Sequence, residues 1–260
     1  MSKSVWSEQE IEILKNNYET VKYPEMTKLL YPKTYNQIKD KAKTYNLRKK
    51  VSCSLQNMEY FENLDDKEVC YWWGFFTADG CFGGRSIIFS IDISDELHLR
   101  KLANRLNSNM QYVHQINDKN PNGHDMVRIA IEDIKILPRI VERFSLKKAK
   151  TYNPFNIDEF LTKERFVYFL AGWIDGDGCI KKNGHSLCIT GHYNWKANFE
   201  KIQKTLKEFY NIKSIIYVIN NKTSTNLLHF NISIRSDVKK LKELINNEVP
   251  YLTRKWDRII

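Results

Sequence analysis

The spacing of apolar residues divides the chain into a short N-terminal segment with helical periodicity and a longer region in which helix and strand patterns alternate. In residues 5–47, apolar positions recur three or four residues apart in three runs, which predicts three helices around one small core. Ser7 followed by Glu10 forms a capping box at the predicted start of the first helix, and Thr34 can cap the third. Over residues 51–66 the periodicity lapses and polar residues dominate, so this stretch is predicted to be a linker.

The region after the predicted linker contains an internal repeat. Residues 72–80, WWGFFTADG, align with residues 170–178, LAGWIDGDG, and this alignment places Asp79 and Asp177 at equivalent positions. The patterns that follow each segment predict the same order of strands and helices. We therefore expect an α+β fold of two pseudo-symmetric halves, each with the element order αββαββα, preceded by a small all-α domain.

These patterns predict a division of the chain into four parts. They are an N-terminal helical domain, a linker and two half-domains, at residues 1–50, 51–66, 67–152 and 153–260. Since both halves lie on one chain, a monomer already contains the symmetric pair that would otherwise require a dimer.

The charge balance points to a nucleic-acid partner. Lys and Arg exceed Asp and Glu by 41 − 31 = 10, and such an excess favours a polyanionic ligand. No apolar run reaches the roughly 18 residues that a membrane-spanning helix needs. The first residues lack the apolar core of a secretory signal, so we expect a protein that acts inside the cell, in the cytoplasm of a bacterial or phage-infected cell.

The cysteines do not suggest a disulfide framework or a zinc site. There are five, and none lies in a C-x-x-C pair or in a common zinc-binding spacing. We therefore expect reduced thiols at Cys53, Cys70, Cys81, Cys179 and Cys188.

The N-terminal segment resembles the Myb/SANT-like helix-turn-helix modules. It has a Trp, an acidic first helix and a last helix that ends in a Lys-Ala-x-x-x-x-Leu stretch, here residues 41–47. The resemblance implies that residues 34–45 enter the major groove of DNA, with basic residues on phosphates. The basic residues expected on the outer face of this helix are Lys33, Lys39, Lys41 and Lys43. The alternative is a protein-interaction module whose lysines are merely solvated.

The repeated segments resemble the paired motifs of the LAGLIDADG homing endonucleases, and residues 169–180, FLAGWIDGDGCI, are the closer match. The likeness covers about residues 67–260. It implies a monomeric endonuclease for intron homing that cuts double-stranded DNA at a long specific site by metal-assisted hydrolysis. It also implies two or more Mg²⁺ ions, which DNA phosphates help to bind, with Asp79 and Asp177 as their protein ligands.

Other site residues follow from the same resemblance. The backbone carbonyls of Ala78 and Gly176 would assist the aspartates in binding metal. Lys150 and Lys255, near the ends of the two halves, would lie close to the scissile phosphates. The first motif departs from the family pattern at Thr77, where an acidic residue is common, and we expect cleavage to survive because that position serves packing or capping.

The small residues of the two motifs predict a close helix contact. Gly74 and Ala78 lie four residues apart on one helix, as do Gly172 and Gly176 on the other, which allows two helix backbones to come together. The two aspartates would then end their helices side by side, where like charges raise each other's pKa unless a cation lies between them.

The glycine after each aspartate is expected to end the helix. Gly80 and Gly178 are predicted to stop their helices in the left-handed conformation. A calcium-binding EF-hand loop is excluded, because Ile180 and Ser186 stand where that loop needs Gly and Glu. A simple Asp-Gly hairpin turn at each motif stays open as an alternative.

The strands suggest a surface that reads DNA. If alternate apolar residues face inward, the opposite face can lie in the major groove as a β-ribbon. In the first half the outward residues would be Ser86, Ile88, Ser90, Asp92 and Arg128, and in the second His229, Asn231, Ser233 and Arg235, with Ile234 facing inward. The hairpin tips would add Arg85, Lys181 and Lys182. The alternative is an ordinary solvated strand face.

Two other functions fit the sequence. Relatives of this family include maturases that help intron RNA to fold, so intron RNA is a possible second partner. The other rival is a DNA-binding regulator that kept the fold and lost cleavage. Retention of both Asp79 and Asp177 argues against the regulator.

Overall fold

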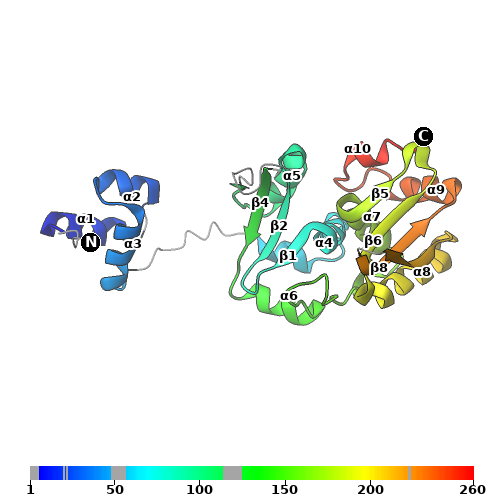
Figure 1. Ribbon diagram of the computed structural model, residues 1–260, viewed down its shortest axis with the longest axis horizontal. Coiled ribbons are helices and arrows are strands. Elements are labelled where there is room, and N and C mark those ends of the chain that lie inside the picture. The colour runs from blue at the N-terminus through cyan, green and yellow to red at the C-terminus, as the bar shows by residue number, and fades with distance from the viewer. Residues whose placement is uncertain (1–5, 20, 22, 48–56, 114–124, 222–223) are drawn as a thin grey trace. The chain divides into compact units, whose positions relative to one another are not determined.

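The structure is a computed structural model with two compact units, residues Met1–Leu55 and Gln56–Ile260. It describes residues 6–19, 21, 23–47, 57–113, 125–221 and 224–260 (Figure 1). Cys53 and residues 51–56 of the predicted linker lie outside the described residues.

The N-terminal unit contains the three predicted helices: α1 (Glu8–Asn17), α2 (Tyr23–Leu29) and α3 (Tyr35–Thr44). Ser7 forms the predicted capping box with Glu10, and Thr34 forms a second one with Gln37. One small apolar core joins the helices, and its buried members are Leu14, Tyr18, Met26, Leu30, Ile38 and Ala42. The helical periodicity therefore predicted this unit correctly.

The basic face of the N-terminal unit is narrower than the sequence predicted. Lys33 pairs with Glu10 at 3.3 Å, and its ammonium lies 5.3 Å from the centre of the Trp6 ring. Lys41 also lies over Trp6, at 5.9 Å. These two lysines pack on the domain's own aromatic ring, while Lys39 and Lys43 remain exposed on α3.

The larger unit contains the repeated halves. The first half comprises η1 (Met58–Glu62), α4 (Lys67–Asp79), β1 (Gly80–Phe82), β2 (Ile87–Asp92), η2 (Ile93–Asp95), α5 (Glu96–Arg105), β3 (Gln111–Val113), β4 (Met126–Ile131) and α6 (Ile136–Phe144). The second comprises η3 (Asp158–Phe160), α7 (Phe166–Asp177), β5 (Gly178–Ile180), η4 (Lys182–Gly184), β6 (Leu187–His192), η5 (Tyr193–Trp195), α8 (Lys196–Tyr210), β7 (Ile215–Asn221), β8 (Ser224–Ile232), α9 (Arg235–Ile245) and α10 (Thr253–Trp256).

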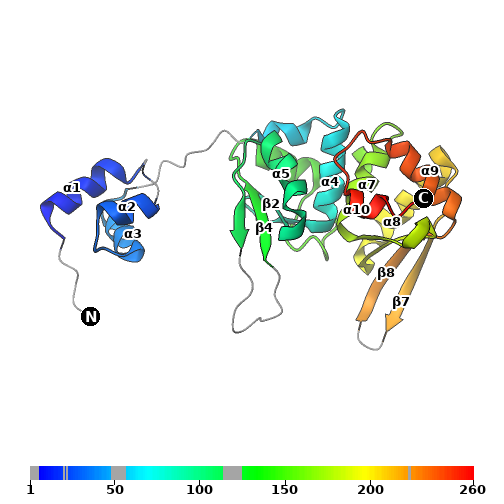
Figure 2. The ribbon, with the colours of Figure 1, turned by 90° about the horizontal axis from the view of Figure 1, so that it is seen from above.

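Each half forms an antiparallel four-stranded sheet with the same topology. The strand orders are β1-β2-β4-β3 and β5-β6-β8-β7. Figure 2 shows β4 and β8 projecting from the same side of the unit. The predicted α+β fold with two equivalent halves is therefore confirmed. No helix in the described part of the chain is long and apolar enough to cross a membrane.

Helices α4 and α7 pack against each other between the two sheets (Figure 1). A Cβ atom on Gly74 would lie 1.8 Å from the Phe169 carbonyl oxygen, and one on Gly172 would lie 1.9 Å from the Tyr71 carbonyl oxygen. At Gly176 an added Cβ would meet the Cβ of Ala78 at 2.1 Å. The backbones touch at these positions, so any larger residue would push the helices apart.

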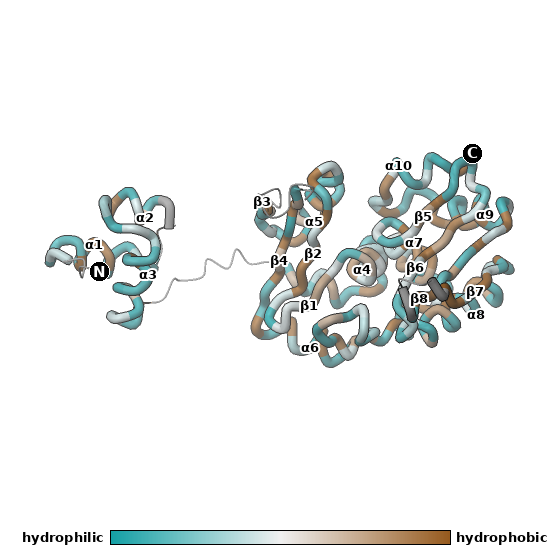
Figure 3. Tube along the Cα trace, viewed as in Figure 1, coloured by the Kyte–Doolittle hydropathy of each residue, from teal (hydrophilic) through white to brown (hydrophobic). Residues whose placement is uncertain are grey.

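Aromatic residues fill the core around the central helices. Trp72, Trp73, Phe75 and Phe76 on α4 are all buried, as the sequence predicted. The sheets cover these rings with apolar residues, and Figure 3 shows predominantly hydrophobic positions along β2 and β4. The core thus fixes the orientation of the helices that carry the two aspartates.

The second part of the predicted linker is not a linker. Residues 57–66 contain the short helix η1, in which Met58 and Phe61 are buried in the core of the larger unit. The indole nitrogen of Trp73 donates to the Phe61 carbonyl oxygen at 3.0 Å. A single helical turn is too short to produce a periodic pattern, so the sequence did not reveal it.

The predicted left-handed glycines are also wrong. Gly80 has φ −81° and ψ 158°, and Gly178 has φ −79° and ψ 149°, which is extended backbone. Each glycine begins a strand directly after its helix, so the chain needs no left-handed turn. Glycine is required for space instead, because an added Cβ would lie 2.5 Å from the carbonyl oxygen of Phe76 or Ile174.

Candidate active site

The structure brings Asp79 and Asp177 to the C-terminal ends of the two packed helices. Each aspartate is the last residue of its helix, so the hairpin-turn alternative is wrong. An added Cβ on Gly176 would lie 3.0 Å from the Oδ2 atom of Asp79, which places the Asp79 carboxylate against the end of α7. Two carboxylates from pseudo-equivalent positions therefore share one region.

The protein around this region disfavours two negative charges. Burial and, next, the Asp177 carboxylate raise the pKa of Asp79 to about 6, against the opposing effects of Lys255 and Lys150. Asp177 is open to solvent, yet desolvation by nearby protein still raises its pKa, while Lys150, Lys255 and the Trp173 side chain oppose the rise. A cation bound between the carboxylates would relieve this repulsion.

Lys150 lies at the C-terminal end of α4. Its ammonium donates hydrogen bonds to the carbonyl oxygens of Thr77 at 2.6 Å and Ala78 at 2.5 Å. A cation is favourable here because the last carbonyls of a helix lack backbone partners and carry the negative end of the helix dipole. Burial lowers the pKa of Lys150, and the nearby Asp177 and Asp79 carboxylates oppose that effect.

Lys255 has the equivalent place at the end of α7. Its buried ammonium donates to the carbonyl oxygens of Ile174 at 3.0 Å, Gly176 at 2.9 Å and Gly178 at 2.8 Å. Burial lowers the pKa of Lys255, with Asp175 as the strongest opposing charge. Both predicted lysines thus lie beside the aspartates, in contact with backbone carbonyls.

The carbonyls of Ala78 and Gly176, which the family resemblance implies as metal ligands, accept these lysine hydrogen bonds. Each carbonyl oxygen has two lone pairs, so one acceptor position is left on each. A metal at that position would lie next to an ammonium group.

Asp175 makes contacts that the sequence did not reveal. It is only 2% exposed and accepts hydrogen bonds from the Leu252 backbone N–H at 2.8 Å, the Tyr71 hydroxyl at 2.7 Å and the Trp256 indole at 2.7 Å. Burial raises the pKa of Asp175 to about 6 against these hydrogen bonds. At the equivalent position in the first half, the Thr77 hydroxyl donates only to the Trp73 carbonyl in its own helix, at 2.9 Å.

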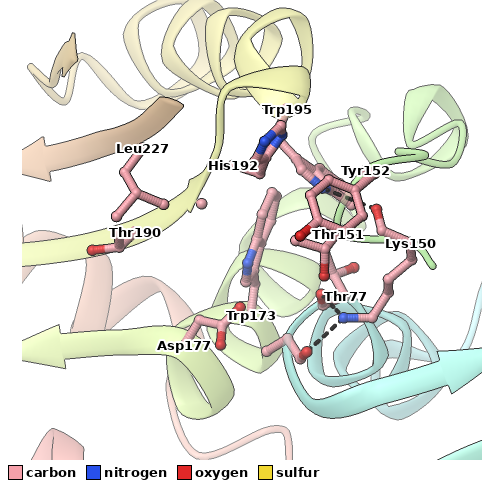
Figure 4. A pocket seen from close by; sticks show the side chains of 12 residues that line it. Thr77, Lys150, Thr151, Tyr152, Trp173, Asp177, Thr190, His192, Trp195 and Leu227 are labelled. Carbon is pink, nitrogen blue, oxygen red and sulfur yellow. Dashed lines mark hydrogen bonds between the residues drawn. The ribbon is translucent and has the colours of Figure 1, made fainter. Parts of the chain in front are cut away.

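A cavity of about 560 Å³ opens beside Asp177 (Figure 4). Polar and aromatic side chains line it together, and its charged lining residues are Lys150 and Asp177. Its lining residues are Thr77, Ala78, Lys150, Thr151, Tyr152, Trp173, Asp177, Thr190, Gly191, His192, Trp195 and Leu227.

The outward sheet faces carry matching rows of polar residues. Arg128 on β4 lies opposite Ser90 and Gln111 on its neighbouring strands. In the second half His229 on β8 lies opposite Thr190 and Tyr217, and the His229 Nε2 atom is 2.9 Å from the Thr190 hydroxyl. Arg128 and His229 thus have equivalent places in their sheets.

Some polar atoms on these faces lack protein partners. Within the described residues, Nε of Arg128 and Oδ1 of Asn231 are buried and make no hydrogen bond. Buried polar groups normally have partners, so such atoms mark places where a ligand can complete the bonding. The hairpin-tip residues Arg85, Lys181 and Lys182 are all exposed.

Three predicted strand positions are wrong. Ser86 is buried and precedes β2, in a turn where its carbonyl accepts from the Gly83 N–H. Strand β8 ends at Ile232, so Ile234 is 40% exposed and not inward-facing. Arg235 is the first residue of α9, and its guanidinium donates to the Ile260 carbonyl at 3.3 Å. Alternating polarity continued past the end of the strand and misled the prediction.

The donor set at the helix ends fits a hard divalent cation. Among the described residues, no cluster of three or more His, Cys, Asp or Glu side chains is arranged to hold a metal. Magnesium, however, commonly uses one or two carboxylates and takes its other ligands from water and phosphate. Asp79 and Asp177 supply that number of carboxylates.

Comparisons with known proteins support the fold. Residues 167–246, from α7 through α9, match a family model described as LAGLIDADG-like domain. The chain is similar to the solved structure of the homing endonuclease I-WcaI bound to its DNA recognition sequence, with TM-score 0.51 and 14% identity, over 76% of this chain and 90% of that chain. At this identity the likeness shows a shared fold.

Two further structures are similar at TM-score 0.49. One is full-length DUF199/WhiA from Thermatoga maritima, with 18% identity over 77% of this chain and 64% of that chain. The other is I-DmoI in complex with DNA and Ca, with 16% identity over 74% of this chain and 96% of that chain. No curated protein matches the chain in sequence.

Proposed function

We propose that this chain, with its LAGLIDADG-like domain at residues 167–246, is a divalent-metal-dependent endonuclease that cuts both strands of DNA at a long specific site. The observation that carries the proposal is the pair of pseudo-equivalent aspartates at the touching ends of α4 and α7, each with a lysine beside it. A fold alone does not establish an activity, so the proposal rests on this site.

We assign the charged groups to two clusters, one of Asp79 with Lys255 and one of Asp177 with Lys150. Lys255 opposes the rise in the pKa of Asp79 more than Lys150 does. For the pKa of Asp177 the order is reversed, and Lys150 has the larger effect. Two such clusters suit two scissile phosphates, one on each strand. Mg²⁺ bound by the aspartates would polarise the phosphate and make bound water a better nucleophile. The protein's own residues orient the water through the carboxylates and place positive charge beside the phosphate through the lysines.

The outward sheet faces would recognise the target. Arg128 is suited to a guanine edge, and His229 and Asn231 can hydrogen-bond to other base edges in the major groove. Ser90 adds a small hydroxyl beside Arg128. The exposed residues at the hairpin tips, Arg85, Lys181 and Lys182, would hold phosphates and fix the register.

The N-terminal unit would act as a second DNA-binding module, through Lys39 and Lys43 on α3. Tethering a second module raises affinity through effective concentration without altering the chemistry. One chain then contains all the parts that a monomeric enzyme needs.

A cleavage selection tests the proposed function. The purified protein is incubated with Mg²⁺ and a plasmid library of randomised inserts, and the linear products are sequenced. A single long consensus in the wild-type products, absent with an Asp79→Asn/Asp177→Asn variant, is the expected result. Specific DNA binding without cleavage in Mg²⁺ or Mn²⁺ would instead indicate a regulator, and binding only to intron RNA would indicate a maturase.

A further inference from the structure

Two cysteines face each other on adjacent strands beside the candidate active site. Cys179 on β5 lies directly opposite Cys188 on β6 in the antiparallel register. Cys179 is exposed and Cys188 is half-buried, on the sheet face that also carries Asn231. Both thiols are free.

The Cα spacing of these two strands falls in the range that a disulfide accepts. The neighbouring pair, Lys181 and Ser186, is hydrogen-bonded through the Lys181 N–H at 2.9 Å. Hydrogen-bonded and non-bonded pairs alternate, so the cysteine pair two residues further along is of the bonded type, with its Cα atoms about 5.5 Å apart. Disulfides have a preferred Cα separation of about 5.5–6 Å.

The thiols also affect each other. Burial raises the pKa of the Cys188 thiol, and the Cys179 thiol beside it contributes to the rise. The other described cysteines lack such a partner across the strand or in the core: Cys81 lies opposite Ile88, and the Cys70 thiol donates to the Leu64 carbonyl. The first half-domain therefore supplies a matched position with one thiol in place of two.

We propose that Cys179 and Cys188 form a dithiol site for a small disulfide oxidant such as oxidised glutathione, and that the resulting protein disulfide disables the adjacent Asp177 end of the active site. One cysteine sulfur attacks the oxidant, forms a mixed disulfide and releases one reduced thiol. The second cysteine sulfur then attacks the bound protein sulfur and releases the other. Two protein S–H bonds become one S–S bond, and the oxidant takes up both hydrogens.

The new bond would shift the strand that begins right after Asp177. Opposite Cβ atoms in a sheet lie about 4.5–5.5 Å apart, whereas a disulfide requires about 3.8 Å. A hydrogen-bonded pair lies at the wide end of this range, so the two Cβ atoms must approach by roughly 1.7 Å. A displacement of about 1 Å at a catalytic group can already cost about 10²-fold in rate. This second part of the proposal rests on the proposed nuclease function, while formation of the disulfide does not.

Peptide mapping tests the site itself. Full-length wild type, Cys188→Ser and Cys81→Ser are incubated with oxidised glutathione, alkylated and digested without reductant. We expect a linked peptide containing Cys179 and Cys188 in wild type and Cys81→Ser, and a glutathione adduct without that link in Cys188→Ser. Adducts alone in wild type, or unreacted thiols, would overturn the proposal.

A cleavage assay tests the consequence. Oxidised and reduced samples of each protein are compared on the selected DNA target, and we expect about a 10²-fold loss in oxidised wild type that reductant reverses. Cys188→Ser should show no such loss between its two samples. A linked peptide with unchanged cleavage would overturn the claimed effect on Asp177. Reduced wild type that cuts no DNA would count against the nuclease function and leave the mapping result valid.

Discussion

In the second half-domain Lys255 uses all three of its N–H donors on carbonyl oxygens at the end of α7, whereas in the first half-domain Lys150 has two such acceptors within the described part of the chain. Lys150 also lines the cavity beside Asp177, so under the proposed function its third donor is available to a phosphate oxygen. Equivalent sequence positions therefore differ in their bonding: both lysines bond a helix end, but Lys255 bonds three carbonyls there and Lys150 bonds two.

The hydrogen bonds that position the two lysines also differ between the half-domains. Asp175 ties the C-terminal segment that carries Lys255 to both central helices, through Leu252, Trp256 and Tyr71. The Thr77 side chain bonds to Trp73 in its own helix and, among the described residues, to no segment near Lys150. The Lys150 carbonyl instead accepts from the Trp195 indole at 3.2 Å. The pseudo-symmetry of the motifs therefore does not extend to the residues that position them.

The largest expected effect comes from removing either aspartate, because each half-domain then lacks or keeps its proposed metal-binding carboxylate independently of the other. Asp79→Asn or Asp177→Asn should lower double-strand cleavage by about 10³-fold or more, because a metal contributes several kcal/mol to the reaction. Specific binding should be nearly unchanged. The measurement is linearisation of a supercoiled target plasmid alongside a binding assay, and full linearisation by Asp177→Asn would contradict the assignment.

Replacing each lysine by methionine should show how Lys150 and Lys255 differ in their effects on cleavage and on stability. Lys150→Met should reduce cleavage by about 10²-fold, since it removes charge next to the phosphate, and should lower stability less than Lys255→Met, because Lys150 is only half-buried and bonds two helix-end carbonyls where Lys255 bonds three. Lys255→Met should lower the free energy of unfolding by about 2–4 kcal/mol, because buried carbonyls lose their donor. Denaturant unfolding and cleavage rates measured on both variants check this, and identical profiles for the two would show that the lysines are equivalent.

Substitution of Asp175 should slow the cleavage of one DNA strand more than that of the other. We expect Asp175→Asn to slow cleavage at the Asp79 and Lys255 cluster by about tenfold, equivalent to about 1.4 kcal/mol, with a smaller effect at the other cluster. Thr77→Ala is the matched control and should change neither rate appreciably. Separate end-labels on the two DNA strands measure each nick. Equal slowing of both strands by Asp175→Asn would mean a general structural role.

The pH dependence should follow Asp79. Its pKa is raised from 3.8 to about 6, so the carboxyl is protonated and unable to bind metal below that range, and cleavage should fall as pH drops through about 6. Because the folded protein holds this proton more tightly than the unfolded chain, the Asp79 contribution to stability declines as pH rises from about 3.8 to 6.

Two measurements check the pH behaviour. Excess Mg²⁺ should move the midpoint of the cleavage profile to lower pH, since metal and proton compete for one carboxylate. Asp79→Asn should melt at a higher temperature than wild type at neutral pH, because the unfavourable charge is gone. A lower melting temperature would mean that the carboxylate stabilises the fold.

The most local expected effects concern base recognition, because each should be confined to one base pair of the target. Arg128→Ala and His229→Ala change equivalent places in the two sheets, so each should relax preference at a different half of the target, by about 1–3 kcal/mol at one base pair. Arg235→Ala, which alters a helix residue bonded to Ile260, should change no base preference. Binding selection from a randomised target library reads all three, and loss spread evenly over every position would indicate phosphate contacts.

Local sequence patterns predicted much of this molecule. The capping boxes, the strand alternation and the paired motifs depend on residues close together in the chain, and they located the helices and the helix-end positions of Asp79 and Asp177. The partners of Asp175 could not be predicted in this way. Leu252 and Trp256 come from the last segment of the chain, and no local periodicity links them to the motif.

The end of β8 is a second feature that the local sequence pattern did not predict. Polar and apolar residues still alternate through Arg235, but the backbone leaves the sheet after Ile232 and begins α9. Alternating polar and apolar residues indicate which side chains are exposed to solvent. The first residues of a helix can show the same alternation over a few positions. Hydrogen bonding between strands sets the boundary, and the sequence of one strand does not contain it.

The glycine contacts between α4 and α7 have a consequence for the DNA product. Under the proposed function, the separation of Asp79 and Asp177 sets the stagger between the two cuts, and that separation is fixed by backbone atoms meeting at Gly74 and Gly172. The recognition faces lie on the strands, away from this contact. Changes to the faces can therefore retarget the enzyme while the overhang length stays the same, because the overhang is encoded in the distance between two helix backbones.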